Sequence, residues 1–198
     1  MAPRFPGTGA AVLLACLILC VLAGCTSSGQ PKPLAAQNQP ADDFSGWRLT
    51  LNGTMEKVLT LDDLRAMPQA TGHGYAVSTV GIRYGPWVVR GVDLRDLAAL
   101  VGGAGPGDQV WISAPDGYLW VFDHDQLEGN GFVTFDADLH EILSPPLRVL
   151  LVCELDGKPL TYDDGGPCRI GIASETPGVV TEGSAWVKWV DRIEVRKG

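Results

Sequence analysis

Positive charge is scarce in this 198-residue sequence: 15 lysines and arginines stand against 23 aspartates and glutamates, for a formal net charge of −8. Binding to nucleic acid depends on a basic surface that neutralises phosphates, and no stretch of the chain supplies one. Anionic membrane surfaces would also repel such a chain. The composition therefore excludes nucleic acid as a partner and requires that any membrane attachment come from lipid.

The sequence also lacks most of the motifs by which enzyme sites are found. It contains no Gly-x-Ser-x-Gly, no Walker loop and no Cys-x-x-Cys, and His140-Glu141 has no second histidine for a zinc-binding His-Glu-x-x-His. The run Asp123-His124-Asp125 consists of adjacent residues whose side chains do not converge on one metal, so it is typical of a helix N-terminus instead. The motifs therefore predict no metal site.

Long apolar runs are limited to one, the fourteen residues from Ala10 to Ala23. A helix of that length is too short to cross a hydrocarbon core of ~30 Å, which favours a signal peptide over the alternative, an uncleaved membrane anchor. Leu22-Ala23-Gly24-Cys25 resembles the bacterial lipobox, whose cysteine receives a diacylglyceryl group and becomes the mature N-terminus. We therefore expect a signal peptide over 1–24 and lipid on Cys25.

The polar, proline-containing stretch that follows predicts a flexible tether over 25–43. Removing the signal peptide also removes Arg4, which leaves 14 lysines and arginines against 23 acidic residues, or −9. The expected location is the cell envelope, lipid-anchored and extracytoplasmic, on the periplasmic side or the outer surface. The expected membrane partner is the bilayer itself, through the lipid on Cys25.

Residues 44–198 have the pattern of one folded domain. Thr60 can cap a helix over 61–67, and apolar spacing predicts a second helix over 94–101. The nearly continuous apolar run 147–155 predicts a central strand. Other expected strands lie at 75–80, 86–89, 109–113, 118–122, 132–135 and 185–196, the third and fourth forming a hairpin around Ala114-Pro115-Asp116-Gly117. This pattern indicates an α+β, β-rich fold with short helices.

Five cysteines occur in the sequence, and three of them belong to the signal peptide or to the lipidation site. Cys153 and Cys168 remain in the folded domain. Outside the cytoplasm such a pair predicts a disulfide, which would contribute about 3 kcal/mol. The alternative is two buried thiols on neighbouring strands.

The order of short motifs along the domain resembles the molybdopterin-binding domain of sulfite-oxidase-type molybdenum enzymes, in a short bacterial form. The motifs are 59–64 (LTLDDL) with Met67-Pro68, Trp87, 91–97 (GVDLRDL), Asp116-Gly117-Tyr118 with Phe122 and Leu127, 156–160 (DGKPL), 165–170 (GGPCRI) and 186–195 (WVKWVDRIEV). Together they cover nearly all of 47–195. The resemblance implies a sulfite-oxidase-like molybdopterin-binding fold with mixed sheets and a cleft for the pterin.

In that family the Pro-x-Arg and Val-Lys-Trp segments lie by the cofactor, and their cations meet its phosphate and pterin. The matching residues here are Arg169 and Lys188. A guanidinium and an ammonium suit a phosphate, because both donate charge-assisted hydrogen bonds. The alternative is that both are ordinary surface cations beside Asp163, Asp164 and Asp191.

The chain departs from the family at the metal. The family's molybdenum ligand is a cysteine thiolate, and the corresponding segment 73–84 (HGYAVSTVGIRY) contains no cysteine. Its nearest counterparts are Ser78 and Thr79. A soft thiolate suits molybdenum, whereas a neutral hydroxyl is a much poorer ligand. Molybdopterin is therefore the expected cofactor, without a metal ligand from the chain.

Three functions follow from this resemblance. As an oxidoreductase, the protein would place Ser78 or Thr79 near the metal and His73, Tyr75 and Arg83 nearest an oxyanion substrate, and would pass electrons to a redox partner. As a binding module, it would hold a pterin-like or other anionic ligand, or a protein. A purely structural envelope lipoprotein is the third alternative.

Overall fold

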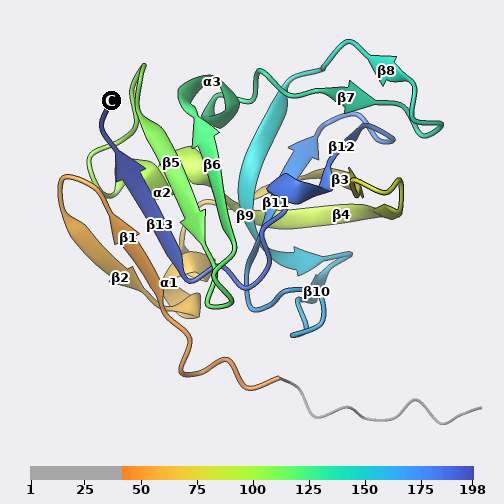
Figure 1. Cartoon of the computed structure of the whole chain (residues 1–198). Helices are drawn as coiled ribbons and strands as arrows, with labels where there is room; N and C mark the ends of the chain where they lie inside the picture. The colour runs from red at the N-terminus through yellow and green to blue at the C-terminus, as the bar shows by residue number, and fades with distance from the viewer. Residues whose placement is uncertain (1–41) are drawn as a thin grey trace, which may run out of the picture. The chain divides into compact units, whose positions relative to one another are not determined.

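Two mixed β-sheets make up most of the chain that the computed structural model describes, residues 42–198 (Figure 1). With few and short helices, this is the β-rich α+β fold that the sequence predicts. The expected signal peptide, Cys25 and nearly all of the expected tether lie outside the described residues.

The first sheet has the strand order β2-β1-β13-β5-β6. Its strands are β1 (Leu49–Asn52), β2 (Glu56–Leu59), β5 (Gln109–Ser113), β6 (Leu119–Asp123) and β13 (Arg192–Arg196). β1 and β13 are parallel, and the other pairs are antiparallel. Alternate residues such as Leu51, Ile112 and Ile193 are fully buried, so one face of the sheet covers the core.

The second sheet has the order β10-β9-β11-β3-β12-β7-β8. Its strands are β3 (Ala70–Val77), β4 (Arg83–Asp93), β7 (Thr134–Phe135), β8 (Glu141–Ile142), β9 (Leu147–Leu155), β10 (Lys158–Pro159), β11 (Arg169–Ser174) and β12 (Val180–Glu182). β4 pairs with both β3 and β9, while β11 pairs with the same two strands. The strands β3, β4, β9 and β11 therefore close into a ring without a free edge.

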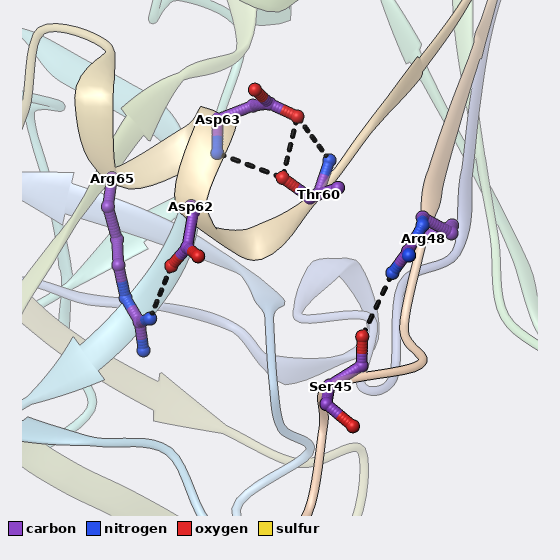
Figure 2. Close-up of polar contacts among 6 residues, drawn as sticks. All are labelled: Ser45, Arg48, Thr60, Asp62, Asp63 and Arg65. Atoms are coloured by element: carbon purple, nitrogen blue, oxygen red, sulfur yellow. Dashed lines mark hydrogen bonds and ion pairs between the residues drawn. The ribbon is translucent and has the colours of Figure 1, made fainter.

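The helices are short and capped by side chains. Thr60 and Asp63 form a capping box at α1 (Leu61–Ala66), as Figure 2 shows. Asp93 caps α2 (Leu94–Ala99), and Asp123 caps α3 (His124–Leu127), so the charged run there is a helix N-terminus, as predicted. No helix within residues 42–198 has the length and apolar character needed to cross a membrane.

Several expected elements are confirmed: both helices, the hairpin of β5 and β6, and the central strand β9. The expectation of a strand over 185–196 was wrong, because only Arg192–Arg196 is extended. A 3-10 turn, η1 (Gly183–Ala185), precedes this stretch, and Trp189 has φ +53°, which interrupts a strand. The apolar residues that recur through 185–196 predict a continuous strand, and this pattern does not indicate the positive φ at Trp189.

Closure of the ring depends on a close approach at Gly91. A Cβ at this position would meet the carbonyl oxygen of Leu151 and lie 2.7 Å from Val152 Cα in β9. We expect Gly91→Ala to lower the free energy of unfolding by about 3 kcal/mol, because backbone atoms must move apart. Gly46→Ala is the control, since nothing lies within 4 Å of its Cβ position, and it should change the value by less than about 0.5 kcal/mol. Urea denaturation measures both, and equal stabilities would contradict the close approach.

Candidate functional site

Four residues singled out from the sequence line one cavity of about 480 Å³, which we call the Arg169 cleft. The residues are Ser78, Thr79, Arg169 and Lys188, joined by Trp87 and Trp186. They come from the end of β3, from β4, from the start of β11 and from the segment after η1. The fold therefore gathers residues that lie more than a hundred positions apart in the sequence.

Arg169 is the central charged group of the cleft. The residue is only 7% exposed, and its Nη1 donates a hydrogen bond to the main-chain oxygen of Asp164 (2.9 Å). Its Nε is buried and has no hydrogen-bond partner within residues 42–198. Burial lowers the pKa of the guanidinium to about 10, so the group stays charged at neutral pH. Arg169 is therefore not the ordinary surface cation of the alternative interpretation, and its burial carries the cost of an unsatisfied donor.

Two tryptophans hold the guanidinium in place. The Cζ of Arg169 lies 5.7 Å from the ring centroid of Trp87 and 5.5 Å from that of Trp186, distances suited to cation–π attraction. Trp186 Nε1 donates to the hydroxyl of Thr181 (3.0 Å), which fixes the indole. Gly74 makes room for it, since a Cβ there would lie 2.6 Å from Trp186 Cη2. The arginine is thus oriented by rigid rings.

Lys188 is the second cation of the Arg169 cleft. Its Nζ donates to the main-chain oxygen of Asp163 (2.6 Å) and lies 5.5 Å from the ring centroid of Trp189. Partial burial and the positive charge of Arg169 lower the pKa of Lys188. The carboxylates of Asp163 and Asp164, which also line the cleft, oppose this shift, and an anion placed beside Arg169 and Lys188 would favour the charged form of Lys188 further. The arrangement is therefore suited to bind a phosphate.

The hydroxyl candidates lie at the turn between β3 and β4. The Ser78 Oγ accepts a hydrogen bond from the Ile82 main-chain N–H (3.0 Å), so it already has a structural role. Thr79 lines the cleft and is exposed. Both hydroxyls are thus near the cations.

The expected oxyanion-binding residues are placed differently. His73 and Tyr75 lie in β3 and Arg83 lies in β4, but none of the three is among the residues that line the Arg169 cleft. Arg83 instead donates to the main-chain oxygen of Ala137. β3 and β4 change register between Gly74 and Ala76, which alters the direction of the side chains beside it. The structure does not bring these three residues to the cations.

No cysteine lines the Arg169 cleft, and residues 42–198 contain no group of three or more His, Cys, Asp and Glu side chains placed to hold a metal ion. Cys153 and Cys168 lie elsewhere, and both are free thiols. Continuing the register of β9 and β11 by one position places Cys168 opposite Cys153. The structure therefore shows two free thiols on neighbouring strands, Cys168 buried and Cys153 half-buried, without the expected disulfide. Directly opposed residues have Cβ atoms ~4.5–5.5 Å apart, whereas a disulfide needs ~3.5–4.5 Å.

The sequence did not identify the tryptophans as site residues. Trp87 and Trp186 read equally well as core, because a large apolar side chain gives the same pattern in both roles. A neighbouring hollow of about 280 Å³ shares Trp186 and Lys188 and extends the Arg169 cleft toward Tyr118 and Trp189.

A β-rich domain whose cleft combines two cations with indole rings is typical of a protein that binds an anionic aromatic ligand. The sequence matches the family described as "Oxidoreductase molybdopterin binding domain" over residues 36–198, so the chain belongs to this family. Its molybdopterin-binding domain is of the sulfite oxidase type, as the motifs predict.

Two known proteins illustrate the relationship. "Sulfite oxidase" of Arabidopsis thaliana is 26% identical over 178 residues, which cover 78% of this chain and 43% of that protein. The crystal structure of the sulfane dehydrogenase SoxCD from Paracoccus pantotrophus matches with a TM-score of 0.59 at 19% identity, covering 79% of this chain and 39% of that one. The second similarity concerns the fold alone. The chain spans less than half the length of either protein.

The residues of the Arg169 cleft fit one part of the family's cofactor and not another. Arg169 and Lys188 suit the phosphate, because each is a charged donor without an ion-pair partner among residues 42–198. The indoles of Trp87 and Trp186 suit a planar pterin. The cleft does not suit molybdenum in the same way, since it offers the hydroxyls of Ser78 and Thr79 and no thiol ligand.

Arg169 should lower the free energy of unfolding of the ligand-free protein, because its role is to bind a ligand. We expect Arg169→Met to raise the free energy of unfolding by about 1 kcal/mol, because it replaces a buried cation and its unsatisfied Nε by a flexible, unbranched apolar chain. Arg148→Met, at an exposed position of β9, should change it by less than about 0.5 kcal/mol. Chemical denaturation of the ligand-free proteins measures both. A loss of stability in Arg169→Met would show instead that the arginine is a structural residue.

Proposed function

We propose that this domain binds a molybdopterin-type ligand through the ligand's phosphate and pterin, without a protein ligand to molybdenum. The observation that carries the proposal is the burial of Arg169 between two indoles, with an N–H that lacks a partner in the described structure. A buried, oriented and incompletely satisfied cation is typical of a site prepared for an anion. Membership of the family supplies the chemical identity of that anion.

Each residue of the Arg169 cleft has a separate part in this binding. Arg169 would donate to the phosphate, and Lys188 would add a second positive charge beside it. Trp87 and Trp186 would exclude water from the guanidinium and strengthen its electrostatic attraction. Redox chemistry would come only from a cofactor that also carried its metal. Ser78 and Thr79 would border the ligand without holding it.

A catalytic molybdopterin-dependent oxidoreductase is the second candidate. The family match and the similarity to sulfite oxidase support it, and it would require Ser78 or Thr79 near the metal and a redox partner protein. Elemental analysis of the protein from its native host separates the two candidates. Molybdenum at a near-stoichiometric level supports catalysis, whereas pterin without molybdenum supports the binding module.

We further propose that the protein is exported and held on the cell envelope by lipid on Cys25, facing the periplasm or the outside. The lipobox-like Leu22-Ala23-Gly24-Cys25 and the apolar run before it support this location. An acidic domain would not bind an anionic bilayer by charge, so covalent lipid would supply the attachment.

Binding of the ligand should depend on Arg169 far more than on the hydroxyls. Each charge-assisted contact contributes about 1.5–3 kcal/mol, so Arg169→Ala should weaken the affinity for a phosphorylated pterin by roughly one to two decades. Ser78→Ala and Thr79→Ala should leave the affinity almost unchanged. Isothermal titration calorimetry measures the affinities, with Arg148→Ala as the control for loss of a distant cation.

The opposite pattern would contradict this assignment. If metal and pterin survive Arg169→Ala and are lost on replacement of Ser78 or Thr79, a hydroxyl is a ligand and the site works differently. If no pterin binds the wild-type protein, the ligand is another anion or a protein.

Lipid attachment should depend on a single residue. We expect Cys25→Ser to abolish metabolic labelling with a radioactive fatty acid and to release the protein from membranes into the soluble fraction, because the acyl chains on Cys25 would supply the membrane attachment. The matched control is Cys20→Ser, which should leave both unchanged. Membrane fractionation and intact mass check the result, and an unaltered mass with unaltered fractionation would refute lipidation at Cys25.

A further inference from the structure

A second and larger cavity, of about 760 Å³, shares no lining residue with the Arg169 cleft. We call it the Cys153 cavity, because the Cys153 side chain contributes to its wall. Figure 2 shows Asp62 and Arg65 of α1 on one side of this region and Ser45 and Arg48, from the segment before β1, on the other. Small-molecule sites typically have volumes of ~300–1,000 Å³, so the Cys153 cavity can accept a small molecule but not a folded protein.

The two thiols of the domain differ in access. Cys153 is half-buried and lines both this cavity and a small hollow beside it, whereas Cys168 is fully buried. Burial and the neighbouring Cys153 raise the pKa of the Cys168 thiol, so Cys168 stays protonated at neutral pH. A small reagent in the cavity can therefore reach Cys153 first, with Cys168 directly behind it.

We propose that Cys153 and Cys168 form a thiol–disulfide exchange site for a low-molecular-weight disulfide that enters the Cys153 cavity. In the first step the Cys153 thiolate attacks one sulfur of the disulfide, so that a mixed disulfide forms and one thiol leaves. In the second step Cys168 passes its proton to the thiolate released in the first step, attacks the Cys153 sulfur as a thiolate and releases the second half of the small disulfide. The small disulfide is reduced to two thiols, the pair is oxidised to one disulfide, and the protons of Cys153 and Cys168 end on the two released thiols.

The fold allows the second step with little movement. Opposed residues on antiparallel strands bring their Cβ atoms to within about 1 Å of the separation that a disulfide requires. Cys168 lies just before the first residue of β11, outside the ladder with β9, and its main-chain oxygen accepts a hydrogen bond from Val190 N (3.1 Å). Free thiols in the reduced protein and a Cys153–Cys168 disulfide after oxidation are both compatible with the position of Cys168.

The cavity also holds charged groups that the ligand would meet. Arg65 is paired with Asp62 (3.0 Å), and the Asp42 carboxylate accepts a hydrogen bond from Tyr162 N (2.5 Å). Arg48 donates only to main-chain oxygens of Ser45 and Trp47, so its charge is not neutralised by a carboxylate contact within residues 42–198. The two arginines and two aspartates that line the cavity give it no net charge, so the thiol is the feature that distinguishes its ligand.

The test uses the full chain with glutathione disulfide as the probe, followed by peptide mapping that separates the two peptides from those of the N-terminal cysteines. Cys168→Ser should trap a stable glutathione adduct on Cys153. Cys153→Ser should react at Cys168 at least about a hundredfold more slowly in the native state, because the thiol is buried. The same variant should react readily in urea, which confirms that its thiol is intact. The wild-type protein should retain no glutathione and should lose two hydrogens as a Cys153–Cys168 bond forms.

Three results would overturn the proposal. One is that Cys168 in the native Cys153→Ser variant reacts with glutathione disulfide as fast as Cys153 does in the Cys168→Ser variant. Another is a wild-type protein that keeps glutathione on Cys153 without forming the internal bond. The last is a wild-type protein in which neither thiol reacts. The wild-type measurements remain decisive if the Cys168→Ser variant does not fold, and circular dichroism checks the folding of both variants.

Discussion

The burial of one cation, Arg169, is the interaction on which the arrangement of this domain's site depends. A buried guanidinium costs free energy unless its surroundings replace water, and here they do so incompletely, with one carbonyl and two indole rings for five N–H groups. The closed ring of β3, β4, β9 and β11 makes this possible, since a ring without free edges supplies a rigid support at the start of β11. The glycine at position 74 then leaves space for Trp186, which positions the guanidinium. The free energy gained by packing the ring thus offsets the cost of holding the Arg169 guanidinium in a fixed orientation.

Alternation along one strand separates two kinds of chemistry. Cys168 and Arg169 are consecutive, and side chains of consecutive extended residues point to opposite faces. Arg169 therefore lines the cleft with Trp186, while Cys168 lies beside Cys153 and the second cavity. A reaction at the thiols and a ligand at the arginine would act on the same backbone from opposite sides. The fold thus allows two sites within one short segment without any shared side chain.

The sequence was informative wherever a structure depends on neighbouring residues. Thr60 and Asp63 predict a helix start, and the run 147–155 predicts a buried strand, because capping and burial act locally. Strand β11 was not predicted, because it is short and contains Arg169, Gly171 and Ser174 among its apolar residues. Its pairing with both β3 and β9 is a non-local property that no local pattern records. The same limit applies to the site. Family resemblance selected Arg169 and Lys188, but it could not show that His73 does not line the Arg169 cleft, because strand pairing and register are non-local properties.

The acidity of the chain is compatible with an anion site because of how the two cations are held. Carboxylates would orient Arg169 and Lys188 but would also cancel their charge, and the loop beside them contains two, Asp163 and Asp164. Both cations instead donate to the main-chain oxygens of these residues, while the Asp164 carboxylate accepts a hydrogen bond from the Thr161 hydroxyl (2.6 Å). A carbonyl dipole fixes direction without forming an ion pair, although the Asp163 and Asp164 carboxylates line the same cleft and partly offset the positive charge of the two cations. Net charge governs what the protein meets at long range, whereas the local geometry of donors decides what it can bind.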